Sequence, residues 1–173
     1  YWMAAGGIEP NKDLPTVVIP PPQMVANMKV GSMDAFCVGE PWNAQLINQN
    51  IGYSAVTTGE LWANHPEKAL SLRSDYVAAN PNATRALLKA VMEAQMFCEA
   101  AANKEQVAEI CAKRRWIGAP AKDLLARLQG NFDYGNGRVV ENSPHLMRFW
   151  SEFASYPSVS YTHLRAHETP EHL

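Results

Sequence analysis

Short apolar runs alternate with segments of helical periodicity over the first sixty residues of the chain. The β-branched run from Thr16 to Ile19 predicts a strand, and the three prolines that follow cannot donate ladder hydrogen bonds and must end it. Helical spacing then covers Gln23 to Val30 and Trp42 to Gln49. Asp34 to Val38 predicts a strand buried on both faces, and Ser54 to Thr58 predicts a third strand. This alternation with tight turns predicts a parallel α/β layer.

The pattern changes to helices beyond about residue 60. Asn80 is a good N-cap and Pro81 suits a first helical turn, so a long helix with an apolar stripe is predicted as far as about Ala101. The other elements predicted here are a strand at Ala69–Arg73, helices at Asp75–Ala79, Lys104–Arg114, Pro120–Gln129 and Pro144–Phe153, and a hairpin or loop within the turn-rich segment Asn131–Asn142.

Composition is that of an ordinary soluble globular protein, with 47% hydrophobic and 18% charged residues among 173. The formal net charge of −2 predicts no affinity for nucleic acid or for an acidic membrane surface. No apolar run approaches the roughly 18–20 residues that cross a bilayer. Cys37, Cys98 and Cys111 form no CxxC pair and are predicted to be small buried hydrophobes. Four tryptophans lie in apolar patterns and are predicted to be core residues: Trp42, Trp62, Trp116 and Trp150.

Long motifs in the chain resemble one protein family. The segments that carry the resemblance are Tyr1–Pro10, Ile19–Asn43, Ile51–Trp62, His65–Ala69, Asn80–Gln95, Phe132–Arg138 and Phe153–Pro157. They are similar to the nitrate-binding solute-binding proteins of bacterial ABC importers, a family that includes bicarbonate-binding relatives. The resemblance implies an α/β, type II periplasmic-binding-protein-like fold that is incomplete. Residues 1–58 would form most of the second lobe, and residues 59–157 the return into the first lobe.

The resemblance also implies a binding site for a small oxyanion. Such an ion is held by oriented N–H donors and a cation in a largely dry pocket. By matching positions in the family, Gly39 and Lys68 would contact the ion, and Pro21 and Val38 would line the pocket. Without the resemblance, Lys68 is typical of a solvated surface lysine and Gly39 of a turn residue. Bicarbonate-binding relatives carry an acidic residue where Lys68 stands, which favours nitrate or nitrite here. Glu40 is predicted to be a hinge or rim carboxylate.

No enzyme motif is present: the chain has no GxSxG elbow, no HExxH and no GxxxxGK[ST] phosphate loop. No catalytic residue, metal ligand or cofactor is assigned. The implied function is the substrate-binding subunit of a nitrate or nitrite importer, periplasmic and lipid-anchored to the inner membrane, with ABC permease and ATPase subunits as partners and no nucleic acid. The alternatives are a cytoplasmic nitrate sensor of the same family and a bicarbonate-binding relative.

Both ends of the chain indicate a fragment. The segment from Tyr1 to Ala5, followed by two glycines, predicts the last turn of a helix and its cap, so we expect the natural N-terminus to lie upstream. Val159–Thr169 matches none of the family pattern and resembles one reading frame of a transposase-derived sequencing adaptor. Residues 158–173 are therefore set aside as non-native, together with the three histidines that they contain.

Overall fold

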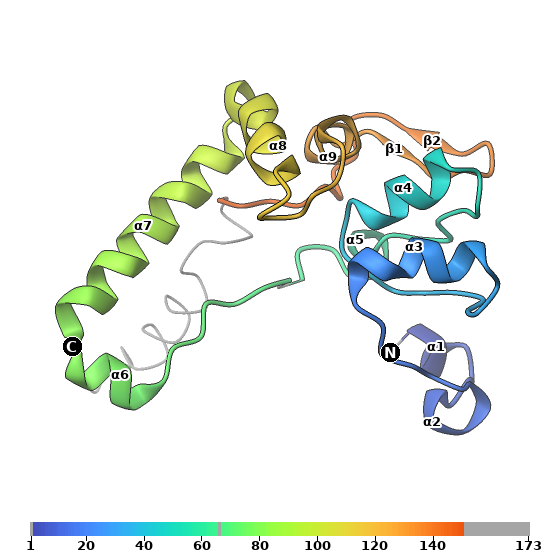
Figure 1. Cartoon of the computed structure of the whole chain (residues 1–173), viewed down its shortest axis with the longest axis horizontal. Coiled ribbons are helices and arrows are strands. Elements are labelled where there is room, and N and C mark those ends of the chain that lie inside the picture. The colour runs from blue at the N-terminus through green and yellow to red at the C-terminus, as the bar shows by residue number, and fades with distance from the viewer. Residues whose placement is uncertain (1, 66, 151–173) are drawn as a thin grey trace, which may run out of the picture.

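The computed structural model describes residues 2–65 and 67–150. Its elements in chain order are α1 (Trp2–Ala5), α2 (Pro10–Asp13), α3 (Pro21–Lys29), α4 (Trp42–Asn48), α5 (Thr58–Leu61), α6 (Ser74–Ala79), α7 (Pro81–Glu99), the 3₁₀ helix η1 (Ala101–Asn103), α8 (Lys104–Ala112), α9 (Ala121–Leu128), β1 (Phe132–Asp133) and β2 (Val139–Val140). Figure 1 shows an arch, with α3, α4 and the β1–β2 hairpin on one side, α6 and α7 on the other, and α8 and α9 between them.

The main apolar cluster lies where α8 packs against α9. Its buried residues are Val107, Ala108, Leu124 and Leu128. Cys98, Cys111 and Phe149 pack against this cluster, and burial raises the pKa of both thiols. These two cysteines therefore sit partly buried in apolar surroundings, as predicted, whereas Cys37 is exposed and its predicted burial is wrong. Leu46 and Ile47 on α4 are buried as well.

Most of the predicted helices are confirmed, with ends that differ by one or a few residues. The N-terminal turn also forms as expected, because Gly7 adopts a φ of 81° and the Ile8 amide donates to the Met3 carbonyl at 2.9 Å. The predicted hairpin is present, with Phe132 opposite Val140 in antiparallel register. None of the described helices is long and apolar enough to span a bilayer.

The predicted parallel strands do not form in the described residues. The segments Thr16–Ile19, Asp34–Val38, Ser54–Thr58 and Ala69–Arg73 have no strand ladder, and the hairpin is the one sheet in this part of the chain. A strand exists only when a neighbour pairs with its backbone, and local sequence cannot supply that neighbour. Val18 accordingly lies fully exposed. The ladder that would cover these segments is absent from the described residues.

The last predicted helix is also wrong over its described part, because residues 144–150 are not helical. The Glu99 carboxylate at the end of α7 accepts hydrogen bonds from the Phe149 and Trp150 amides, at 2.7 and 3.2 Å. Those two amides are thus directed to a side chain rather than to carbonyls one turn earlier. The remainder of the predicted helix lies outside the described residues, as does the predicted tail at residues 158–173.

Candidate functional site

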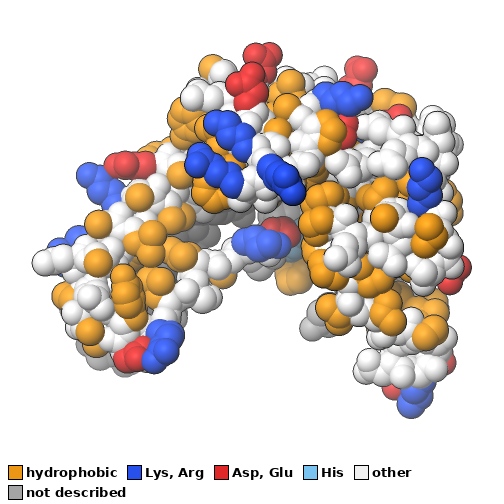
Figure 2. Space-filling view, in the orientation of Figure 1, with side chains coloured by type: hydrophobic (Ala, Val, Ile, Leu, Met, Phe, Trp, Pro, Cys, Tyr) orange, Lys and Arg blue, Asp and Glu red, His pale blue; other side chains and the backbone are white. Residues whose placement is uncertain are grey.

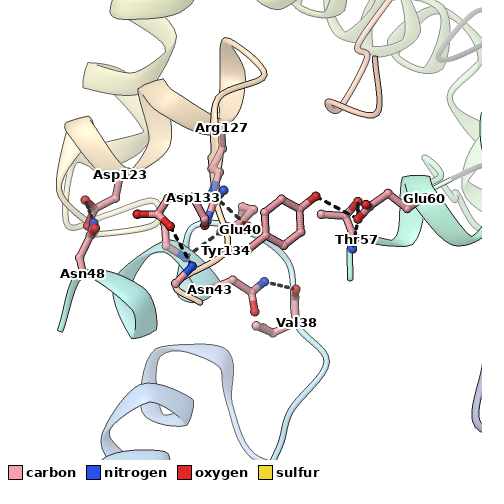
Figure 3. Close-up of polar contacts among 12 residues, drawn as sticks. Val38, Glu40, Asn43, Asn48, Thr57, Glu60, Asp123, Arg127, Asp133 and Tyr134 are labelled. Atoms are coloured by element: carbon pink, nitrogen blue, oxygen red, sulfur yellow. Dashed lines mark hydrogen bonds and ion pairs between the residues drawn. The ribbon is translucent and has the colours of Figure 1, made fainter. Parts of the chain in front are cut away.

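The segment that precedes α4 is held in place at its two flanks. The Val38 carbonyl accepts a hydrogen bond from Asn43 Nδ2 at 3.1 Å, and Glu40 Oε2 accepts one from the Ala44 amide at 3.1 Å (Figure 3). The Glu40 carboxylate thus caps one of the free amides in the first turn of α4. Gly39 lies between these two anchored residues, so its amide has a defined position.

Gly39 itself is exposed and has open space beside it. A Cβ built on this residue would meet no atom within 4 Å. Its backbone is not among those with positive φ, so the conformation does not demand glycine. Neither strain nor crowding within the described residues explains a glycine here. The open space leaves the Gly39 backbone accessible from outside.

A partly buried ion pair ties this segment to α9. Arg127 Nε lies 3.3 Å from Glu40 Oε1, and only 8% of the Arg127 side chain is exposed. Arg127 also donates to the Asp133 carbonyl at 2.9 Å (Figure 3). Its guanidinium lies over the Phe132 ring, 4.8 Å from the ring centroid. Burial raises the pKa of Glu40, and the Arg127 charge offsets part of that effect. Glu40 therefore acts as an anchor that fixes the Val38–Gly39 backbone.

Glu60 forms a second tie, between α5 and the hairpin. Its Oε2 accepts hydrogen bonds from the Thr57 amide at 2.8 Å, the Thr57 hydroxyl at 2.9 Å and the Tyr134 hydroxyl at 2.9 Å, and its Oε1 pairs with Arg138. Burial alone raises the pKa of Glu60, but the hydrogen bonds from Thr57, Arg138 and Tyr134 outweigh it and lower this pKa to about 2. Glu60 is thus a structural carboxylate that stays ionised.

The structure places the other two predicted site residues apart from this framework. Pro21 is the first residue of α3 and is exposed. Lys68 lies in the extended segment after α5, with 84% of its side chain exposed, and pairs with Glu67 at 2.7 Å. Among the described residues, no polar contact joins Lys68 to Gly39 or Val38. Val38 and Gly39 are consecutive in the chain, and the described contacts do not join Lys68 to them.

One pocket of about 260 Å³ lies between α4, α9 and β1. Its lining residues are Ala44, Ile47, Asn48, Lys122, Asp123, Ala126, Arg127, Asn131 and Asp133. The Asp123 carboxylate inside it already accepts from Asn48 Nδ2 at 2.7 Å (Figure 3). The pocket contains two carboxylates and none of the four predicted site residues. Within the described ranges, no group of three metal-ligating side chains occurs.

Comparison with known proteins identifies the family. The profile of the NMT1-like family matches residues 1–112. The chain belongs to the NMT1-like family. Its relatives in this family include the nitrate/nitrite binding protein NrtA of Nostoc sp. PCC 7120, which is 56% identical over 161 residues that cover 93% of this chain and 37% of that protein. The bicarbonate-binding protein CmpA of Synechococcus elongatus PCC 7942 is 39% identical over 162 residues, covering 93% of this chain and 36% of that protein.

A crystal structure of the periplasmic nitrate-binding protein NrtA from Synechocystis PCC 6803 matches this NMT1-like chain with a TM-score of 0.84 and 51% identity. The match covers 88% of this chain and 40% of that one. It confirms the family resemblance and the fold class, since the chain adopts part of a type II periplasmic-binding-protein fold. The chain spans less than two-fifths of the length of these curated relatives.

Sequence reasoning missed two residues that position the site. Arg127 and Glu60 both make polar contacts with residues far away in the sequence, yet Arg127 lies in a predicted amphipathic helix and Glu60 just follows a predicted strand. For Arg127, the available signal was a cation on the apolar side of a predicted helix, next to Leu124 and Leu128. For Glu60, the signal was the capping-box spacing from Thr57.

Proposed function

We propose that this chain is part of the substrate-binding subunit of an ABC importer for nitrate or nitrite, and that it works in the periplasm, anchored by lipid to the inner membrane. The observation that carries the proposal is the graded identity, 56% to a nitrate/nitrite binding protein against 39% to a bicarbonate-binding one. The matched crystal structure is that of a periplasmic nitrate-binding protein, which supports the location. The partners proposed with it are an ABC permease and an ATPase subunit.

In this proposal the anion is bound and released without chemical change. The Gly39 amide donates to one oxygen, and the open space beside that residue lets a small ligand approach. The half-buried Val38 and the proline at position 21 supply apolar walls that exclude water and strengthen each polar contact. Closure of two lobes around the ion is the physical basis of uptake by such receptors.

Lys68 supplies the positive charge in the proposed site. In the described structure it pairs with Glu67 on the surface, and an exposed pair of this kind contributes only about 0–1 kcal/mol. Lys68 can therefore leave Glu67 and pair with a bound anion at little cost in free energy once the cleft closes. We propose nitrate rather than bicarbonate as the ligand because position 68 carries a lysine and not a carboxylate.

The test is a chimera in which residues 1–157 replace the matching segment of the Nostoc relative, studied by calorimetric titration with nitrate. Replacing Lys68→Glu removes a charged partner worth about 2 kcal/mol, so nitrate affinity should fall roughly 30-fold or more. The matched control is Lys89→Glu, which makes the same charge change on an exposed lysine of α7 and should leave affinity unchanged. A folded chimera that binds bicarbonate but not nitrate, or a Lys68→Glu variant that binds normally, would refute the proposal.

A further inference from the structure

The connection between α8 and α9 carries a compact run of positive charge. Lys113, Arg114, Arg115 and Trp116 are consecutive and all exposed, and we refer to them as the basic loop. From position 110 to position 122 the chain has four basic residues and no acidic one, although its formal net charge is −2. Figure 2 shows Lys and Arg side chains gathered over α8 and α9. The net charge of the chain therefore conceals a local positive surface.

The cations of the basic loop are not neutralised internally. Within the described ranges, the salt bridges involve other basic side chains, and none of them includes Lys113, Arg114 or Arg115. Two carboxylates on α8 are nearest in sequence, Glu105 and Glu109, and both are exposed and outside any ion pair in this part of the chain. The loop thus presents charge that is available to an outside partner.

Trp116 adds an amphipathic ring to this charged surface. It is 61% exposed, contrary to the core position predicted for it, and Arg115 lies over its ring at 5.1 Å. A tryptophan left in water loses the burial that usually stabilises such a large apolar side chain. Indole rings with one polar edge are favoured where water meets a lipid bilayer, and cations beside them keep their charge in water.

The backbone of the basic loop is held by hydrogen bonds, so the loop loses little conformational entropy when it binds a partner. The Trp116 amide donates to the Lys113 carbonyl at 2.8 Å, and the Ile117 amide donates to the Cys111 carbonyl at 3.0 Å. Gly118 then turns the chain with a φ of 72°, and Ala119 is buried. The turn is therefore mounted on the packed pair of α8 and α9 rather than hanging as a free linker.

We propose that the basic loop docks the protein on an anionic lipid surface. Successive side chains of a turn project in different directions, so a single carboxylate cannot pair with all three cations at once. A fluid layer of phosphate headgroups can meet each of them separately, while Trp116 enters the interface. Docking of this kind does not depend on nitrate binding. It differs from the expectation based on the net charge of the chain, because a charged surface within a Debye length responds to the local charge of the loop rather than to the net charge.

The test is flotation of the whole chain on a density gradient with vesicles of equal phosphatidylglycerol and phosphatidylcholine, with pure phosphatidylcholine vesicles as the reference, because aggregated chain does not float. Each cation near an anionic surface contributes about fivefold in affinity, so a Lys113→Ala, Arg114→Ala, Arg115→Ala variant should bind roughly 100-fold more weakly. The matched control is the triple variant K12A, K29A and R85A, which carries the same net charge on exposed sites elsewhere and should bind nearly as the parent does. Raising the salt should weaken binding of the parent and barely affect the loop variant.

A second readout locates the contact. Phosphatidylglycerol with brominated acyl chains should quench the fluorescence of the parent, and a Trp116→Phe variant should lose most of that quenching while the other tryptophans remain. Equal binding by the loop variant and the control variant would overturn the proposal, and so would equal binding to the uncharged vesicles. Retention of a polyglutamate peptide by the loop in the absence of vesicle binding would assign it to an acidic protein instead.

Discussion

Two parts of the molecule use amphipathic helices in opposite ways. In the first part, α4, α5, α9 and the β1–β2 hairpin form what we call the hairpin assembly, where apolar faces are covered and polar groups cross-link distant segments. In the second part, α6 and α7 form what we call the helical arm. Of the nineteen residues of α7, only Thr84 is buried among those described, and large apolar side chains lie open on it: Leu87, Leu88, Met96 and Phe97.

Apolar periodicity in the sequence thus specifies a helix but not the element that packs against it. The sequence predicts apolar positions at helical spacing on both α7 and α9, yet α9 has α8 and α4 to cover it. The exposed stripe gives the chain a large apolar surface, which soluble proteins normally keep covered. We therefore expect low solubility when the chain is expressed alone.

The largest effect should come from the ion pair at the centre of the hairpin assembly. Replacing Arg127→Leu leaves the Glu40 carboxylate partly buried without its partner, which should lower the free energy of unfolding by about 3 kcal/mol. The matched change on the helical arm, Arg85→Leu, removes an exposed cation and should cost less than about 0.5 kcal/mol. Urea unfolding of both variants measures the contrast. Equal costs would mean that the hairpin assembly is not the better-organised part.

A smaller effect, with a distinct pH signature, should follow from Glu60→Gln. The substitution removes charge-assisted hydrogen bonds and should cost about 2 kcal/mol at neutral pH. Because the pKa of Glu60 is lowered to about 2 from its ordinary 4.5, its contribution is complete above pH 4.5 and is lost as pH falls through 2.

Unfolding measured from pH 7 to pH 2 checks this prediction. The free energy of unfolding of the parent should decline between pH 4.5 and pH 2 as Glu60 becomes protonated. The glutamine of the variant does not titrate, so the free energies of unfolding of the parent and the variant should converge near pH 2. Curves that stay parallel down to pH 2 would show that Glu60 is not held ionised by its partners.

The smallest effect on stability is expected on the helical arm. Leu88 is 44% exposed, so Leu88→Gln should change the free energy of unfolding by less than about 0.5 kcal/mol and should raise solubility. Its counterpart in the hairpin assembly is Leu46→Gln, at a side chain only 3% exposed, which should cost about 3 kcal/mol. Solubility and urea titration give both quantities. If the two variants were equally destabilised, the face of α7 would have to be covered.

The helices could be predicted from sequence because capping residues and apolar spacing are local. Asn80 and Pro81 mark the start of α7, and Gly130 marks the end of α9 with a φ of 82°. The strands could not be predicted in the same way. Residues such as Val17 and Val18 have side chains typical of a strand, but no other segment of the described residues pairs with their backbone.

For the candidate site, the resemblance supplied Gly39 and Lys68, and the open space at the glycine is consistent with that choice. The contact between Arg127 and Glu40 could not be predicted from the sequence, because the two residues are 87 positions apart and only the fold brings them together. The sequence pattern also predicted core positions for Trp62 and Trp116, but these side chains are 66% and 61% exposed in the structure. Apolar composition alone does not distinguish a packed ring from one displayed at a surface.

We propose above that the Gly39 amide and the Lys68 ammonium together hold a small oxyanion. The most direct measurement is a nitrate titration of the chimera labelled with ¹⁵N-glycine, followed by amide resonances. We expect a saturable shift of the Gly39 N–H resonance that chloride does not reproduce and that needs roughly 30-fold more nitrate, or more still, in the Lys68→Glu variant. Nitrate binding that leaves the Gly39 resonance unmoved would contradict it.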